Sequence, residues 1–159
     1  MPNKLPEILI KIALVVLEII FAGVLVYFRV LNTGWILILM GLGLVIWLLV
    51  HLALMTVFIA SLKLQLLDIS LYLAVHFFYT WAWLLQPDGG DSDVVTWTLQ
   101  KVYDWPALDP FLKQYGDTLL AYAGGATVIC YLLIILLVIV KLIQFTRSRR
   151  KSQPAQTLP

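Results

Sequence analysis

Three ionisable side chains lie inside strongly apolar stretches of the sequence, namely Glu18, His51 and His76. These two histidines are the only ones in the chain. Ionisable groups at membrane depth are costly and usually pair with one another or serve an ion or proton pathway. With a rise of about 1.5 Å per residue, Glu18 lies about 15 Å, and each histidine about 13 Å, from the inner edge of its stretch. We therefore expect the three side chains to share one polar layer.

A structural role and a proton or cation relay both fit this polar layer. In the structural interpretation, Glu18 accepts a hydrogen bond from a histidine, or from Tyr79, Thr56 or Thr80, and fixes the helix register. Such interhelical bonds contribute about 0.6–2 kcal/mol. In the relay interpretation, a carboxyl group in lipid and a neighbouring histidine exchange a proton, which is a recurrent use of buried charge in membranes.

A haem or metal site is a further interpretation of the same residues. His51 and His76 at matching depth could be the axial ligands of a b-type haem, provided that small residues leave room for the porphyrin. Gly41 and Gly43 are small but lie far from His51 along their stretch. With Glu18, the two histidines also match a two-His-one-Glu zinc set in residue type, although the H-E-x-x-H spacing is absent.

The segment LVVLEIIF places Glu18 in the first apolar stretch of a small chain. In this feature the chain resembles the small multidrug resistance transporters, and the resemblance implies cation binding through one membrane-embedded carboxylate. The chain departs from that family in its long acidic link between the third and fourth stretches, its biased charges and its basic tail.

The elements that would position these residues are membrane spans. The chain of 159 residues is 62% hydrophobic and only 13% charged, which excludes a soluble globular domain and a disordered chain. A crossing needs about 20 mostly apolar residues. We therefore expect an all-α, polytopic membrane protein, a single domain built as an antiparallel bundle of four transmembrane helices. The expected spans are about 8–28, 35–60, 67–85 and 119–145.

Basic residues predict the orientation of these spans. Eight lysines and arginines lie at the two termini and in the link between the second and third spans, against three on the opposite side. We expect the chain to lie in a plasma membrane or a bacterial inner membrane. The positive-inside rule then places both of its termini in the cytoplasm. The net charge of +2, without a long basic run, makes nucleic acid an unsuitable partner. The single cysteine, Cys130, excludes an internal disulfide.

The outer link, residues 87–118, predicts two short amphipathic helices. QPDGGDSD forms a turn, apolar residues from Val95 to Tyr103 recur at helical spacing, and Asp109 followed by Pro110 opens a second helix. These helices rest on the membrane surface or dock a partner subunit. The aromatic residues that would anchor a partner are Trp97, Tyr103, Trp105 and Phe111.

Small residues in the fourth span predict a close helix contact. Ala121, Gly124 and Gly125 form a face of the small-xxx-small kind, which serves packing within the bundle or a seam between copies. The tail, residues 146–159, begins with the basic run RSRRK and is expected to be disordered.

No motif of a soluble enzyme is present, so we expect a protein that is not an enzyme. The first hypothesis is an accessory or structural subunit of a larger membrane complex, which contacts lipid and other membrane subunits through its spans and its aromatic outer link. The second is a homo-oligomeric channel or proton-coupled carrier that uses Glu18. The third is a membrane cytochrome with haem b between His51 and His76.

Overall fold

The computed structural model describes residues 5–32, 35–63, 65–89, 95–103 and 105–151. Helices make up 88% of the structure. The elements, in chain order, are α1 (Leu5–Leu31), α2 (Trp35–Ser61), α3 (Leu66–Leu84), β1 (Pro87–Gly89), β2 (Val95–Trp97), α4 (Thr98–Val102) and α5 (Leu108–Lys151).

Three helical segments are long and apolar enough to cross a membrane: Leu5–Leu31, Gly41–Ser61 and Leu108–Arg149. Helices suit such sequences because lipid offers no partners for backbone polar groups, which must bond within the segment. The outward faces of these helices carry large apolar side chains, among them Ile19, Leu42 and Leu132, each more than 60% exposed. The protein is therefore membrane-embedded. The helix α3, with 19 residues, is shorter than these three.

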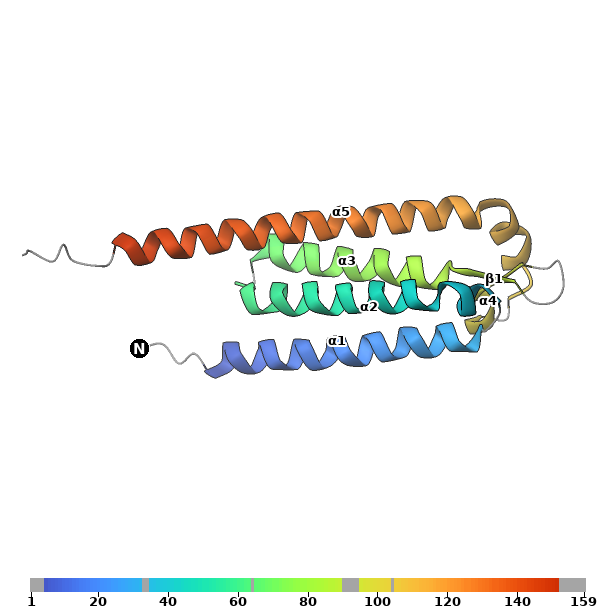
Figure 1. Cartoon of the computed structure of the whole chain (residues 1–159), viewed down its shortest axis with the longest axis horizontal. Coiled ribbons are helices and arrows are strands. Elements are labelled where there is room, and N and C mark those ends of the chain that lie inside the picture. Colours follow the sequence, from blue (N-terminus) through green and yellow to red (C-terminus); the bar gives the residue numbers. More distant parts are fainter. Residues whose placement is uncertain (1–4, 33–34, 64, 90–94, 104, 152–159) are drawn as a thin grey trace, which may run out of the picture.

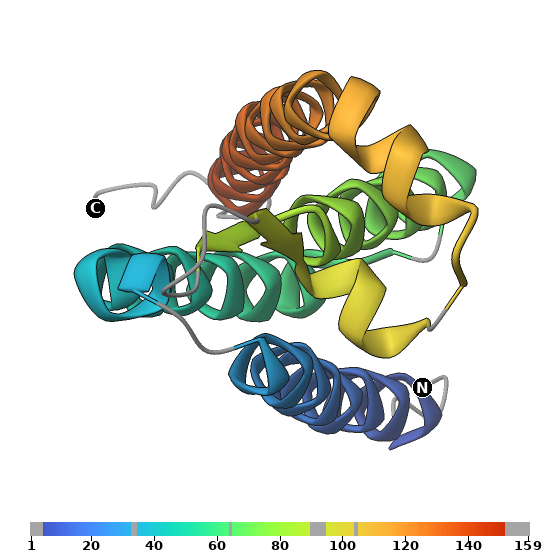
Figure 2. The same ribbon diagram turned by 90° about the vertical axis from the view of Figure 1, so that its right-hand side faces the viewer.

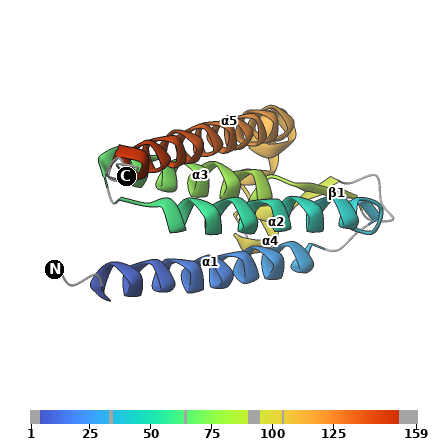
Figure 3. The same ribbon diagram turned by 60° about the vertical axis from the view of Figure 1, so that its left-hand side comes forward.

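The long helices α1, α2, α3 and α5 lie side by side along the longest axis (Figures 1 and 3). The helices α2 and α3 each contact both α1 and α5. The first turns of α1 and the last turns of α5 lie at one end of the structure, and the strands and α4 lie at the other (Figure 1). This arrangement brings the middles of four helices together.

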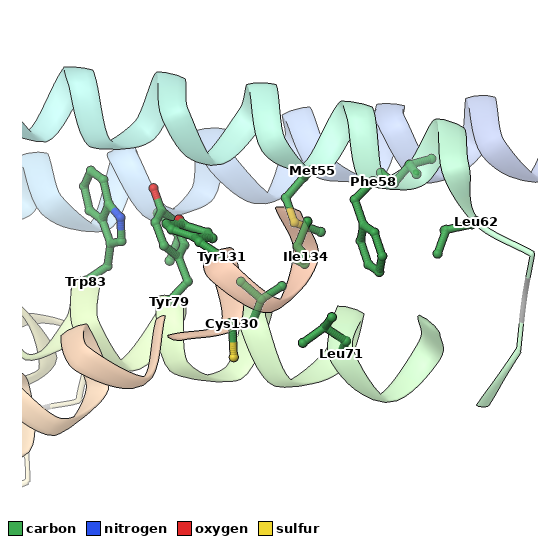
Figure 4. Close-up of a cluster of buried hydrophobic side chains, with 12 residues drawn as sticks. Met55, Phe58, Leu62, Leu71, Tyr79, Trp83, Cys130, Tyr131 and Ile134 are labelled. Atoms are coloured by element: carbon green, nitrogen blue, oxygen red, sulfur yellow. The ribbon is translucent and has the colours of Figure 1, made fainter. Parts of the chain in front are cut away.

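The main hydrophobic core lies where α2, α3 and α5 face one another. Met55 and Phe58 from α2 pack with Tyr79 from α3 and Ile134 from α5, and all four are buried (Figure 4). On α1, the buried residues are Glu18, Ala22, Leu25 and Arg29. Their spacing of three and four residues puts them on one stripe, which faces the other helices.

The link after α3 begins as a β-hairpin, so the expected helix from Val95 is wrong over its first three residues. Pro87–Gly89 pairs antiparallel with Val95–Trp97. The Thr96 hydroxyl donates to the Asp88 carbonyl and to the Asn32 side chain at the end of α1. Asn32 is 64 residues away from Thr96 in the sequence, and both bonds hold the segment extended. A short helix follows as α4.

The second expected helix is present but is not a separate element. It begins at Leu108, includes Pro110 in its first turn and continues through Gly116 into the fourth long helix as α5. These first turns lie across the end of the other helices (Figure 2). Leu112 is fully buried there against Trp97 and Leu99, in a second small core.

The C-terminal tail begins later than expected. The helix α5 continues to Lys151, so the expectation of disorder is wrong for residues 146–151. Residues 152–159 lie outside the described part of the chain.

Candidate functional site: a buried Glu–His–His cluster

The structure brings Glu18, His51 and His76 together from α1, α2 and α3. The Glu18 carboxylate lies between the two rings, with Oε1 2.8 Å from Nε2 of His51 and Oε2 2.8 Å from Nε2 of His76. The Glu18 and His51 side chains are 1% and 0% exposed, and the His76 side chain is 17% exposed. The helices α1, α2 and α3 therefore each contribute one ionisable side chain to a single cluster.

Two tyrosines complete the cluster and bring in α5. The Tyr72 hydroxyl donates to Oε2 of Glu18 over 3.2 Å. The Tyr131 hydroxyl on α5 lies 2.8 Å from Nδ1 of His51. The other histidine is held by its own helix, since Nδ1 of His76 lies 2.7 Å from the backbone carbonyl of Tyr72. All four long helices thus meet at this cluster.

The hydrogen bonds require a proton shared between Glu18 and His76. A backbone carbonyl only accepts, so Nδ1 of His76 must carry hydrogen toward Tyr72. The bond between Nε2 and Glu18 then needs a second proton, carried either by the ring or by the carboxyl group. The cluster therefore holds one exchangeable proton in a buried place.

The contact between His51 and Glu18 differs from that of His76. Nε2 of His51 and Oε1 of Glu18 lie at ion-pair distance. The pair lacks the alignment of a hydrogen bond, and both atoms are buried without any other hydrogen-bond partner among the described residues. Buried polar atoms are almost always satisfied, so this close contact is the main interaction of both atoms.

Aromatic rings pack against both histidines of the cluster. The Tyr79 ring stacks on His51 with centroids 3.7 Å apart and an interplanar angle of 10°. The Phe21 ring lies 4.9 Å from that of His76. A low-polarity surround strengthens the interactions within the cluster and makes any unpaired charge there costly.

The sequence placed the three ionisable groups in one layer, and the described geometry has them in contact. Tyr72 and Tyr131 were not predicted as members. Tyr72 lies one helical turn before His76 and so on the same face, which is a signal that the sequence contained. Of the donors that were expected, Thr56 instead bonds the carbonyl of Leu52 in its own helix.

The haem interpretation does not fit this geometry. The two histidine rings are close, with centroids 5.7 Å apart, and the Glu18 carboxylate fills the space between their Nε2 atoms. A porphyrin would need that space. A single ion would not, and the ligand atoms of the three residues all lie within 4.8 Å of one another.

Two further buried ion pairs lie nearer the ends of the long helices. Arg29 on α1 pairs with Asp88 on β1 over 3.1 Å, and Lys141 on α5 pairs with Asp68 on α3 over 2.7 Å. Each pair joins two elements that are distant in sequence, α1 with β1 and α3 with α5.

One of the four expected anchors for a partner is wrong. Trp97 is buried, because its indole packs against Gly116 in the first turns of α5. Tyr103, Trp105 and Phe111 are exposed, so the surface that we expected for docking consists of these three residues.

Among the described residues, no atom packs closely against Gly124 or Gly125 of α5. A Cβ atom added at Gly124 or Gly125 would have no atom within 4 Å. Instead, Ala121 and Gly125 line an open apolar groove of about 680 Å³ between α3 and α5. Packing within the bundle therefore does not explain this face.

No protein-family model, curated protein or solved structure matches this chain. The likeness to the small multidrug resistance transporters thus stays confined to one carboxylate in the first span.

Proposed function

We propose that the protein is an accessory or structural subunit of a larger membrane complex, built as an antiparallel bundle of four spans with both termini in the cytoplasm of a plasma or bacterial inner membrane. In this proposal α3 also crosses the membrane, which brings the number of spans to four. Its 19 residues give a length of about 28 Å, close to the hydrocarbon thickness of about 30 Å. The contact of His76 on α3 with Glu18 supports an equal depth for their helices.

The open groove between α3 and α5 carries this proposal. One wall is made of small residues of α5, and the other of aromatic residues of α3; the principal ones are Ala121, Gly125, Ala126, Phe77, Phe78 and Trp81. Small residues let the backbones of two transmembrane helices approach closely, and aromatic residues are enriched at the cores of interfaces. We infer that a transmembrane helix of a partner subunit lies in this groove.

Phe111 belongs to the groove, and two exposed aromatic residues precede it in the chain. Phe111 lines the groove and is 46% exposed, and Tyr103 and Trp105, which precede α5, are more exposed still. A partner helix in the groove would meet these rings where it leaves the membrane, which is where tyrosine and tryptophan are favoured.

The internal polar groups support a subunit over a channel. Among the described residues, the buried carboxylates Glu18, Asp68 and Asp88 each have a basic partner within 3.1 Å. The groove is lined by apolar and aromatic residues, apart from the hydroxyl of Tyr122. A pore should instead show a polar stripe along its path.

The experiment that tests this proposal is native mass spectrometry of the protein extracted in mild detergent from its host membranes. We expect masses that require another polypeptide. Gly125→Leu fills the groove and should weaken that association about tenfold or more, which corresponds to about 1.4 kcal/mol. Gly23→Leu on α1 is the matched control, because Gly23 is also exposed and has no atom within 4 Å of an added Cβ.

Two results would contradict the subunit proposal. One is a mass that is always a multiple of 18.0 kDa, which would favour a homo-oligomer. The other is a partner complex that Gly125→Leu and Gly23→Leu affect equally, which would place the partner elsewhere.

A second candidate function is a proton-coupled carrier that uses Glu18. The shared proton between Glu18 and His76 favours it, since relays of carboxylates and histidines recur in membrane transport. The purified chain in lipid vesicles separates the two functions. Proton flux that Glu18→Gln abolishes, without loss of folded protein, would support the carrier and contradict a purely structural role.

A further inference from the structure

We infer that Glu18, His51 and His76 form a binding site for one divalent transition metal ion, with zinc as the first candidate. The inference concerns the interior of the four helices, whereas the subunit proposal rests on the groove between α3 and α5. Either can fail without the other.

The donor atoms have the right types and lie near one another. Two imidazole nitrogens and one carboxylate are the ligand set of many zinc and non-haem iron sites. Their ligand atoms lie within 4.8 Å of one another. In a tetrahedral site with metal–ligand distances of about 2.0–2.1 Å, two ligand atoms lie about 3.3 Å apart. The two 2.8 Å contacts use different oxygens of Glu18, so with one ligand atom per residue the separations of up to 4.8 Å would have to close by up to about 1.5 Å on binding.

Both histidine rings are oriented as metal ligands usually are. A ligating histidine normally donates its second ring N–H to a carbonyl or another polar group, which fixes the ring and leaves the other nitrogen for the metal. His76 does this through Nδ1 and the Tyr72 carbonyl, and Nδ1 of His51 lies on the Tyr131 hydroxyl. The two Nε2 atoms that remain point toward the same carboxylate.

A bound cation would also suit the contact between His51 and Glu18. Among the residues that the structure describes, Nε2 of His51 and Oε1 of Glu18 are buried 2.8 Å apart without an aligned hydrogen bond. A proton between two atoms needs a nearly linear arrangement, whereas an ion can accept both lone pairs from different directions. A bound metal ion would thus satisfy two atoms that the protein alone does not.

The charges of the cluster are compatible with the exchange of a proton for a metal ion. A metal ion would replace the proton shared between Glu18 and His76, and that proton would leave to solvent. Three protein ligands around a zinc ion leave a fourth position for water, as in catalytic zinc sites. The Tyr72 hydroxyl lies 3.2 Å from Oε2 of Glu18 and could bond to such a water.

The test is metal analysis of the full chain in mild detergent. The protein is treated with a chelator, loaded with Zn²⁺ or Co²⁺, freed of unbound ion and measured for metal content, with visible absorption as a second readout for Co²⁺. We expect one ion per chain and a rise in melting temperature on loading. Glu18→Gln, His51→Gln and His76→Gln should each lower the affinity by more than about 100-fold, and Tyr131→Phe by about 10–100-fold.

Glu7→Gln is the matched control, because Glu7 lies on the same helix with an exposed side chain and should leave stoichiometry unchanged. Wild-type protein that retains no ion after loading overturns the inference. So does a Glu18→Gln variant that binds as tightly as wild type. If a ligand variant fails to fold, two measurements still test the inference. They are the metal stoichiometry of the wild-type protein and the affinity of the folded Tyr131→Phe variant.

Discussion

At the residue scale, the buried ion pairs are the costliest parts of this molecule to leave incomplete. Arg29 and Asp88 have side chains only 3% and 2% exposed, and they join the end of α1 to the hairpin. Removal of one partner from a buried pair leaves an uncompensated charge, which typically costs 3–5 kcal/mol. Replacement of both partners by apolar residues of similar volume is often neutral.

We therefore predict that Asp88→Ala lowers the free energy of unfolding by about 3–5 kcal/mol, and that Arg29→Met/Asp88→Leu recovers most of this loss. Denaturant unfolding in detergent, followed by tryptophan fluorescence, measures both. Asp117→Ala is the control, since Asp117 is exposed on α5, and should change stability by less than about 0.5 kcal/mol. A double variant no more stable than Asp88→Ala would show that the charges themselves are not the cause.

The sequence could predict the depth of the three ionisable groups but not their contacts. Depth follows from the helical rise and from the ends of apolar stretches, and it placed Glu18 level with both histidines. The rotation of each helix about its axis depends on packing against its neighbours. For this reason Tyr131, from a helix far along the chain, was not predicted to contact His51.

At the element scale, the contact between Gly116 and Trp97 joins α5 to the hairpin. A Cβ atom at Gly116 would lie 2.5 Å from two carbons of the indole, much closer than a van der Waals contact. Glycine is unfavourable inside a helix by about 1 kcal/mol relative to alanine. Its presence at this position is therefore explained by the close approach of the ring.

Gly116→Ala and Gly124→Ala are predicted to have opposite effects on stability. At Gly116 the added methyl group must displace a buried indole, which costs about 1–3 kcal/mol and outweighs the gain in helix propensity. At Gly124, on the same helix, nothing lies within 4 Å, so the variant should gain about 0.5–1 kcal/mol. Melting temperatures of the two variants, measured side by side, check this. Equal shifts would mean that the indole moves at no cost.

The hairpin was the element that sequence reasoning missed. Each strand has only three residues, too few for an alternating pattern to be recognised. Val95 and Leu99 also fit a helical spacing, and the competing information comes from Asn32 and Asp88, which bond to Thr96 from elsewhere in the chain. Local periodicity could not contain that information, whereas it sufficed for the long apolar helices.

At the scale of the whole molecule, the central question is whether three helices or four cross the membrane. Length and hydropathy alone identify three, and α3 is the one in doubt by that measure. Packing favours four, because α3 lies alongside the others and its His76 reaches Glu18 on α1 (Figure 1). In the proposed arrangement of four spans, His76 and Glu18 lie at the same depth.

The number of crossings determines the relative sides of the two ends of the chain, which gives a direct test. Four crossings put Glu7 and Ser148 on the same side and Lys101 on the other; three put Glu7 and Ser148 on opposite sides. We predict that single cysteines at positions 7 and 148, in a Cys130→Ala background, react with a membrane-impermeant maleimide only after the cells are permeabilised. A cysteine at position 101 should react in intact cells. Reaction at 7 and 148 from opposite sides would remove α3 from the bundle of spans. It would also contradict the shared depth on which the Glu–His–His cluster depends.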